Sequence, residues 1–146
     1  MTEVSRDMRR CALQALYQFD ILGAVDAESV SRSLADGPCS EKARVGGLQL
    51  ALEVWPRREG IDLLVKPCTP EWPTHRQPVI DRNILRIALH KINDVGTPGG
   101  KVINEAVELA KEYGTEKSPG FVNAVLDRIW KSGDTPGQAE EKPVEH

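Results

Sequence analysis

Hydrophobic side chains recur every three or four residues along most of the chain, a spacing typical of helices that bury one face. Runs that alternate with period two, as strands do, are few. The pattern therefore predicts an all-α fold of about seven helices. Their expected apolar stripes are Met8, Ala12, Ala15 or Leu16, and Phe19; Val30 and Leu34; Val45, Leu48, Leu52 and Trp55; Ile61, Leu64 and Val65; Ile80, Ile84, Ile87, Ala88 and Ile92; Ile103, Ala106, Val107, Ala110 and Tyr113; and Val122, Val125, Leu126 and Ile129.

Short polar residues and glycines mark where these helices begin and end. Ser5, Asp26 and Ser40 are expected N-caps, because their side chains accept hydrogen bonds from the first free N–H groups of a helix. Ser118, which a proline follows, gives the same signal for the last helix. Gly114 is expected to end the helix before it.

Prolines and glycines also suggest how the chain is divided. Residues 66–78 contain four prolines and Trp72, and they are expected to link an N-terminal half, about 1–65, to a C-terminal half, about 79–132. Both halves belong to one predicted helical domain, 1–132. The pair Gly46-Gly47 is expected to weaken the third helix locally. Residues 133–146 are polar and rich in Gly, Pro and Glu, so a disordered tail is predicted.

Composition excludes several classes of protein. The net charge of −3 argues against nonspecific coating of nucleic acid, although it leaves room for a local basic patch. Cys11, Cys39 and Cys68 stand far apart and include no C-x-x-C pair, so free thiols are expected rather than a disulfide frame or a metal site. With no apolar run long enough for a membrane span and no signal-peptide core, a cytoplasmic protein without membrane contact is expected.

Candidate catalytic chemistry is sparse. The histidines, of which His90 is expected to be partly exposed, show neither metal-ligand nor nucleophile spacing. Phosphate-binding glycine motifs do not occur, so no cofactor is predicted. Glu105 fits a role at a helix start better than acid–base catalysis. We therefore do not expect an enzyme.

Two clusters of side chains are better suited to RNA binding than to catalysis. Arg6, Arg9 and Arg10 have i, i+3, i+4 spacing, which places three guanidinium groups on one side of a helix start, where they can bind phosphates or simply be solvated. Phe121 lies just inside the last helix, after Lys117, and its ring can either stack on an unpaired base or pack inward beside its apolar neighbours. The residues alone leave both alternatives open.

Three blocks of sequence resemble the NusB family of bacterial transcription antitermination factors. They are RRCALQALY at 9–17, DRNILRIAL at 81–89 and KVINEAVELAKEYGTEKSPGFVNAVLD at 101–127, in the family's order. The resemblance implies an all-α fold of two packed three-helix-like bundles and no enzymatic activity. It also implies binding of boxA RNA together with NusE, a small-subunit ribosomal protein, and a role in the antitermination complex of RNA polymerase, chiefly on ribosomal RNA transcripts.

The resemblance also implies site residues by position. Arg6, Arg9, Arg10, Lys101, Ser118 and Phe121 match positions near RNA, and Tyr17 and Asp81 match the NusE surface. The chain departs from the family pattern at Ser5 and Asp7, which replace basic residues, and at Ala124, which replaces a glycine. Lys117 stands where an acidic residue is common, so it is added to the RNA-binding set as a compensating charge.

Three other functions compete with this one. Related folds serve as RNA-binding modules of ribosomal RNA methyltransferases, but such an enzyme needs a long Rossmann-like domain. A self-associating helical scaffold is the second alternative, since some members of the family form homodimers. A small enzyme is the third.

Overall fold

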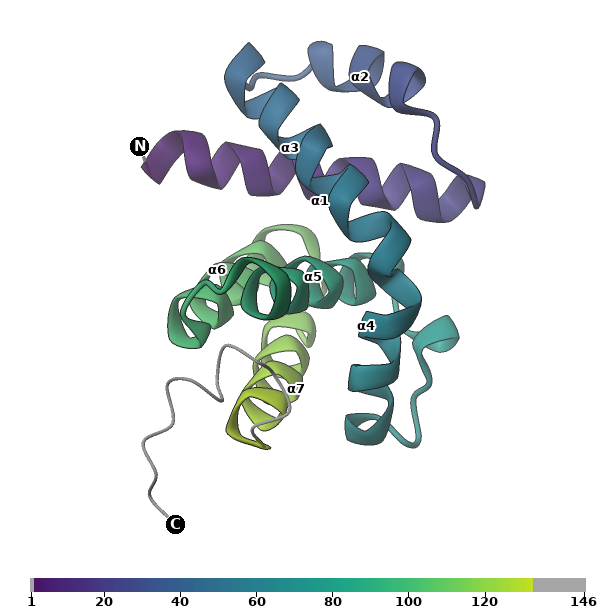
Figure 1. The fold of residues 1–146 in the computed structure, drawn as a ribbon, viewed down its shortest axis with the longest axis vertical. Coiled ribbons are helices and arrows are strands. Elements are labelled where there is room, and N and C mark those ends of the chain that lie inside the picture. The colour runs from purple at the N-terminus through teal and green to yellow at the C-terminus, as the bar shows by residue number, and fades with distance from the viewer. Residues whose placement is uncertain (1, 133–146) are drawn as a thin grey trace. The chain divides into compact units, whose positions relative to one another are not determined.

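The computed structural model describes residues 2–132, and within them every regular element is a helix (Figure 1). This confirms the predicted all-α class. Contacts divide the chain into two compact units, Met1–Pro56 and Arg57–His146. The division thus lies at residue 56, earlier than the expected end of the N-terminal half near 65. The predicted tail, 133–146, lies outside the described residues.

The first unit contains α1 (Thr2–Leu22), α2 (Ala27–Ala35) and α3 (Glu41–Val54). Asp26 and Ser40 accept hydrogen bonds from the N–H groups of Ser29 and Ala43, at 3.0 and 3.2 Å, so both are the N-caps that the sequence predicts. Ser5 is not a cap, because α1 already begins at Thr2. Apart from Met8, which is half-buried, the apolar stripes of α1 and α2 are buried as expected, including Ala12, Leu16, Phe19, Val30 and Leu34.

Small residues bring α3 close to α1. A Cβ atom added at Gly47 would lie 2.5 Å from the Cβ of Cys11 and 2.7 Å from the carbonyl oxygen of Met8. The buried face of α3 is Ala43, Gly47, Ala51 and Val54. The expected Val45, Leu48, Leu52 and Trp55 stripe is therefore wrong as a core face, since Val45 is 58% exposed and Leu52 is 39% exposed, although Trp55 is buried.

The second unit contains α4 (Arg58–Val65), α5 (Val79–His90), α6 (Gly99–Tyr113) and α7 (Ser118–Ser132). Helix α5 contacts the other three and is buried over most of its length, as its nearly continuous apolar sequence requires. Gly114 is the C-cap of α6, as predicted. The apolar stripe of α7, which consists of Val122, Val125, Leu126 and Ile129, is buried as expected.

The proline-rich segment 66–78 is ordered by two short 3-10 turns, Lys66–Cys68 and Thr74–Arg76. It belongs to the second unit, as does α4 before it, which packs on α5. Helix α4 contacts α5 and α7, and the Lys66–Cys68 turn contacts α4 and α7, so this segment packs within the second unit.

A π-helical turn, Lys91–Val95, follows α5 and ends at Gly96, whose φ of 82° is left-handed. The turn brings Asp94 Oδ2 to 3.0 Å from His90 Nδ1 and 3.4 Å from Arg57 Nε. His90 is only 3% exposed, so the expectation of a partly exposed side chain is wrong. Its buried imidazole is satisfied by the nearby carboxylate.

Candidate nucleic-acid interface

The three arginines at the start of α1 lie in three different environments. Arg6 is exposed, Arg9 is 8% exposed, and Arg10 donates from Nη1 to Asp7 Oδ1 at 2.7 Å. The expected row of three solvent-facing guanidinium groups is therefore not observed in the unit that contains α1. The helical spacing indicated a common side, but it carried no information on which side chains pack inward.

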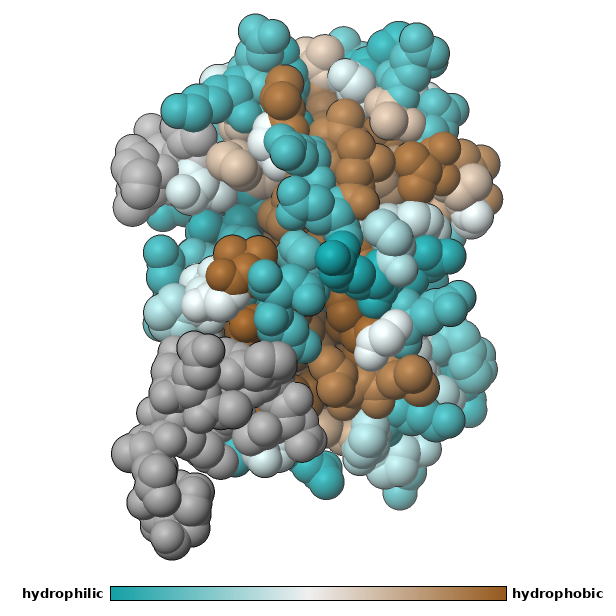
Figure 2. All heavy atoms as spheres, viewed as in Figure 1, coloured by the Kyte–Doolittle hydropathy of each residue, from teal (hydrophilic) through white to brown (hydrophobic). Residues whose placement is uncertain are grey.

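Tyr17 lies farther along α1 and is 42% exposed. One turn later Ile21 and Leu22 are 63% and 62% exposed, so the end of α1 carries large apolar side chains on its surface. In the view of Figure 2, hydrophobic residues reach the surface over α1–α3. An exposed aromatic beside exposed aliphatic side chains is typical of a protein-binding surface.

Asp81 and Ser118 meet inside the second unit. Ser118 Oγ donates to Asp81 Oδ1 at 2.7 Å and accepts from the N–H of Thr115 at 2.9 Å. Asp81 is 2% exposed and Ser118 is 1% exposed. Neither side chain therefore presents polar atoms to solvent, which differs from the direct roles expected for them at the NusE and RNA surfaces. Their bond instead joins the first turn of α5 to the first residue of α7.

This pair changes how α7 begins. Ser118 was expected to be the N-cap, but it is the first helical residue. The backbone carbonyl of Lys117 accepts from the N–H of Phe121 at 3.1 Å. Gly114 leaves space for the serine: a Cβ atom there would lie 2.4 Å from Ser118 Oγ. A hydroxyl at this position thus orients the 115–118 turn through a tertiary bond rather than capping its own helix.

Burial raises the pKa of Asp81 above its ordinary value of 3.8, and the hydrogen bond from Ser118 opposes that rise without cancelling it. A carboxylate in an apolar environment loses hydration, which disfavours its charged form. The hydroxyl of Ser118 offsets part of that loss by donating to the charged oxygen. The two residues are therefore electrostatically coupled as well as structurally joined.

Phe121 is half-buried and meets Trp72 of the proline-rich segment. Their ring centroids are 4.9 Å apart and their planes lie at 68°, an edge-to-face pair. Trp72 is 38% exposed. The sequence drew attention to Trp72 only as part of the expected linker, because no local spacing relates residue 72 to residue 121. Its contact with a candidate RNA-binding ring was missed for that reason.

Lys101 and Lys117 are exposed. Lys101 lies in the first turn of α6, and Lys117 immediately precedes α7. The second unit therefore combines two solvent-facing ammonium groups with an aromatic pair. Among residues 2–132, no three His, Cys, Asp or Glu side chains group so as to hold a metal ion. In the same residues, no helix is both long and apolar enough to cross a membrane.

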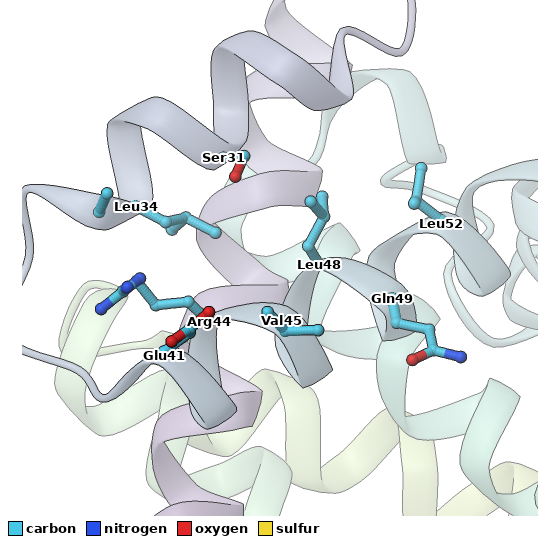
Figure 3. Close-up of a pocket in the computed structure, with 9 residues that line it drawn as sticks. Ser31, Leu34, Glu41, Arg44, Val45, Leu48, Gln49 and Leu52 are labelled. Atoms are coloured by element: carbon cyan, nitrogen blue, oxygen red, sulfur yellow. The ribbon is translucent and has the colours of Figure 1, made fainter.

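A hollow of about 320 Å³ lies between α2 and α3 in the first unit. Figure 3 shows Leu34 of α2 and Val45, Leu48 and Leu52 of α3 around it, with Arg44 and Glu41 at one end. None of the residues expected to bind RNA or NusE lines this hollow. Val45, Leu48 and Leu52, the residues of the expected α3 stripe that lie outside the core, line this hollow.

These features define an all-helical protein whose second unit presents two exposed lysines and a partly exposed aromatic pair. The model of the NusB family matches residues 6–131. The chain belongs to the NusB family. A relative from Chloroflexus aggregans, named transcription antitermination protein NusB, is 38% identical over 84% of this chain and 83% of its own length. One of the same name from Dehalococcoides mccartyi strain CBDB1 is 37% identical over 97% of this chain and its whole length.

Solved structures agree with this assignment. NusB from T. maritima is 32% identical, covers 92% of this chain and 96% of its own, and superposes with a TM-score of 0.76. A structure of the antitermination factors NusB and NusE in complex with double-stranded RNA is 25% identical, covers 90% of this chain and 99% of its own, and has a TM-score of 0.76. The predicted NusB-like fold is thereby confirmed.

Proposed function

We propose that this protein is a transcription antitermination factor that binds boxA RNA together with NusE and promotes antitermination, chiefly of ribosomal RNA transcription. The observation that carries the proposal is the family match over residues 6–131, with relatives that bear the antitermination name across nearly their full length. The neighbour that contains NusE and RNA supports both partners. The protein acts in the cytoplasm with RNA polymerase, by binding rather than by catalysis.

The site residues divide into direct and indirect roles. Phe121 provides an aromatic surface for an unpaired base, and Lys101, Lys117 and Arg6 provide cations for phosphates, because single-stranded RNA is read by stacking plus a modest phosphate track. Tyr17 contributes to the NusE surface through its exposed ring.

Buried members of the expected site support the exposed ones. Asp81 and Ser118 hold the 115–118 turn, which carries Lys117 and leads into the first turn of α7 with Phe121. They thus act as positioning residues. Arg9 is mostly buried and Arg10 is paired with Asp7, so neither contributes a fully solvent-facing charge. This division explains how a protein of net charge −3 presents a small cationic surface.

Fluorescence anisotropy tests the proposal directly. Labelled boxA-type RNA, a scrambled single strand and a duplex are titrated with the protein, with and without NusE from the same organism. We expect selective binding of the boxA-type strand that tightens when NusE is present. Equal affinity for all three RNAs in both conditions would exclude the boxA function. Sedimentation of the free protein in parallel separates this result from self-association, the competing scaffold function.

Matched lysine variants test the site. Lys117→Ala is expected to weaken RNA binding several-fold, because it removes a cation next to the proposed base site. Lys111 is an exposed lysine in the last turn of α6, and Lys111→Ala is the control. This variant should bind RNA as the wild type does. If both substitutions weaken RNA binding equally, Lys117 contributes only to the overall charge of the protein, and the proposed phosphate contact at Lys117 is wrong.

A further inference from the structure

Trp72 is the tryptophan with the most exposed side chain in the described part of the chain, at 38%, yet it lies on an ordered support. Its own N–H donates to the carbonyl of Thr69 at 3.0 Å, and its carbonyl accepts from Gln77 Nε2, also at 3.0 Å. Gln77 is 3% exposed, so this clamp is internal to the second unit. An exposed indole held at a fixed backbone position loses little conformational freedom on binding a ligand.

The ring pair itself covers only part of its own aromatic surface. In an edge-to-face pair, the edge of one ring covers one face of the other. The centroid distance of 4.9 Å and interplanar angle of 68° between Trp72 and Phe121 fit this arrangement. Three of the four ring faces are therefore not covered by the pair itself. Two rings meeting at a steep angle form a corner in which a flat ligand stacks on one ring while its edge meets the other.

A cation lies one helical turn before this corner. The N–H of Phe121 donates to the carbonyl of Lys117, and the Lys117 side chain is exposed. A flat apolar surface with a cation nearby suits a nucleobase whose phosphate is held beside it. An aromatic side chain of a protein partner could stack on the rings but would carry no phosphate for Lys117 to bind.

We infer that Trp72 is a second RNA-contacting residue, and that its indole and the Phe121 ring together hold one unpaired base of the bound RNA. This inference rests on the proposed function and extends its site into the proline-rich segment between α4 and α5. It gives that segment a role in binding, beyond its covalent connection of two helices.

Three substitutions at residue 72 separate stacking from packing. Trp72→Ala removes the ring, Trp72→Leu keeps apolar cover over Phe121 without a π-surface, and Trp72→Phe keeps a smaller ring. Because stacking a base on an aromatic side chain is worth about 1–3 kcal/mol, Trp72→Ala should raise the Kd for boxA-type RNA about 5- to 150-fold. Trp72→Leu should behave like the alanine variant, and Trp72→Phe should retain most of the affinity. Thermal denaturation of each variant checks that the fold is kept.

Tryptophan fluorescence provides an independent readout. In a protein with Trp55→Phe and Trp130→Phe, the remaining fluorescence comes from Trp72, and boxA-type RNA should quench it along the same binding curve as the anisotropy. The matched protein with Trp72→Phe and Trp130→Phe retains Trp55, which is 9% exposed and should show little quenching.

The outcomes distinguish this inference from the proposed function. If the wild type binds boxA-type RNA selectively but Trp72→Ala and Trp72→Leu bind it equally well, the inference fails and the proposed function stands. Tighter binding by Trp72→Ala would also overturn it, since Trp72 would then be a cover over Phe121. A loss of NusE binding with unchanged RNA affinity would assign Trp72 to a protein partner instead. Absence of selective binding by the wild type would remove the proposed function itself.

Discussion

The hydroxyl of Ser118 serves two polar groups at once, so its removal should cost more than an exposed serine would. In Ser118→Ala, the N–H of Thr115 loses its acceptor and the carboxylate of Asp81 loses its donor. Leaving buried polar groups unsatisfied costs about 1–3 kcal/mol. We expect the free energy of unfolding at pH 7 to fall by that amount, as measured by urea denaturation.

The pH dependence of this loss follows from the raised pKa of Asp81. Burial disfavours the charged carboxylate, so Asp81 lowers native stability once it is ionised: the cost is absent below pH 3.8, grows as pH rises, and is complete above the folded-state pKa. Because the hydrogen bond from Ser118 lowers the pKa of Asp81, its removal should raise that pKa further. The penalty of Ser118→Ala should therefore shrink as pH falls from the folded-state pKa of the variant to that of the wild type. Asp81→Asn is the control, because its amide oxygen still accepts from Ser118 while the charge is gone. A pH-independent penalty in Ser118→Ala would show that Asp81 is not involved.

Residue type predicted chemistry at this site better than it predicted exposure. Arg9, Asp81 and Ser118 were assigned to binding surfaces by their positions in the family resemblance, yet all three are more than nine-tenths buried. Polar residues are buried where a specific partner satisfies them, as for Asp81 and Ser118. That partner lies 37 positions away, so no helical spacing reveals it.

At the scale of elements, Gly47 allows α3 to pack against α1. Gly47→Ala gains up to about 1 kcal/mol of helix propensity. Its new methyl group, however, would meet the backbone carbonyl of Met8 at 2.7 Å, which no rotamer change relieves. Overpacking of this kind costs about 1–3 kcal/mol, so we expect a lower melting temperature.

Gly60→Ala is the matched control for this prediction. Gly60 lies within α4, and nothing is within 4 Å of an added Cβ atom there. That substitution should keep or raise the melting temperature, because only the helix propensity changes. If Gly47→Ala were stabilising as well, α1 and α3 would not require the close approach.

The sequence predicted the number of helices and most of their buried faces, but it failed on α3. Two of its large apolar residues, Val45 and Leu52, are exposed, whereas Gly47 and Ala51 face the core. Hydrophobic periodicity assumes that large side chains fill an interface. Where two helices approach closely, small residues form the interface, and their pattern is not a hydrophobic one.

At the scale of the whole molecule, physical analysis of the sequence and its family resemblance contributed different things. Periodicity predicted the helices, and the slightly acidic net charge argued against nonspecific coating of nucleic acid. RNA and NusE as partners came from the resemblance, because a partner's identity is not encoded in the spacing of residues within one chain. The expected site residues are divided between the two units, with Arg6, Arg9, Arg10 and Tyr17 in the first and the others in the second.

Only three exposed cations are proposed as phosphate contacts, which predicts a weak dependence of RNA binding on salt. For single-stranded RNA, each neutralised phosphate contributes about −0.7 to the slope of log Kobs against log salt concentration. With Arg6, Lys101 and Lys117 as phosphate contacts, their joint contribution should be about −2. The slope of Lys117→Ala, measured with NusE present, should be shallower than that of the wild type by about 0.7, and the slope of Lys111→Ala should be unchanged. Trp72→Ala should lower affinity at every salt concentration without altering the slope, since stacking releases no counterions. A Lys117→Ala slope identical to that of the wild type would mean that Lys117 contacts no phosphate, whatever its effect on affinity.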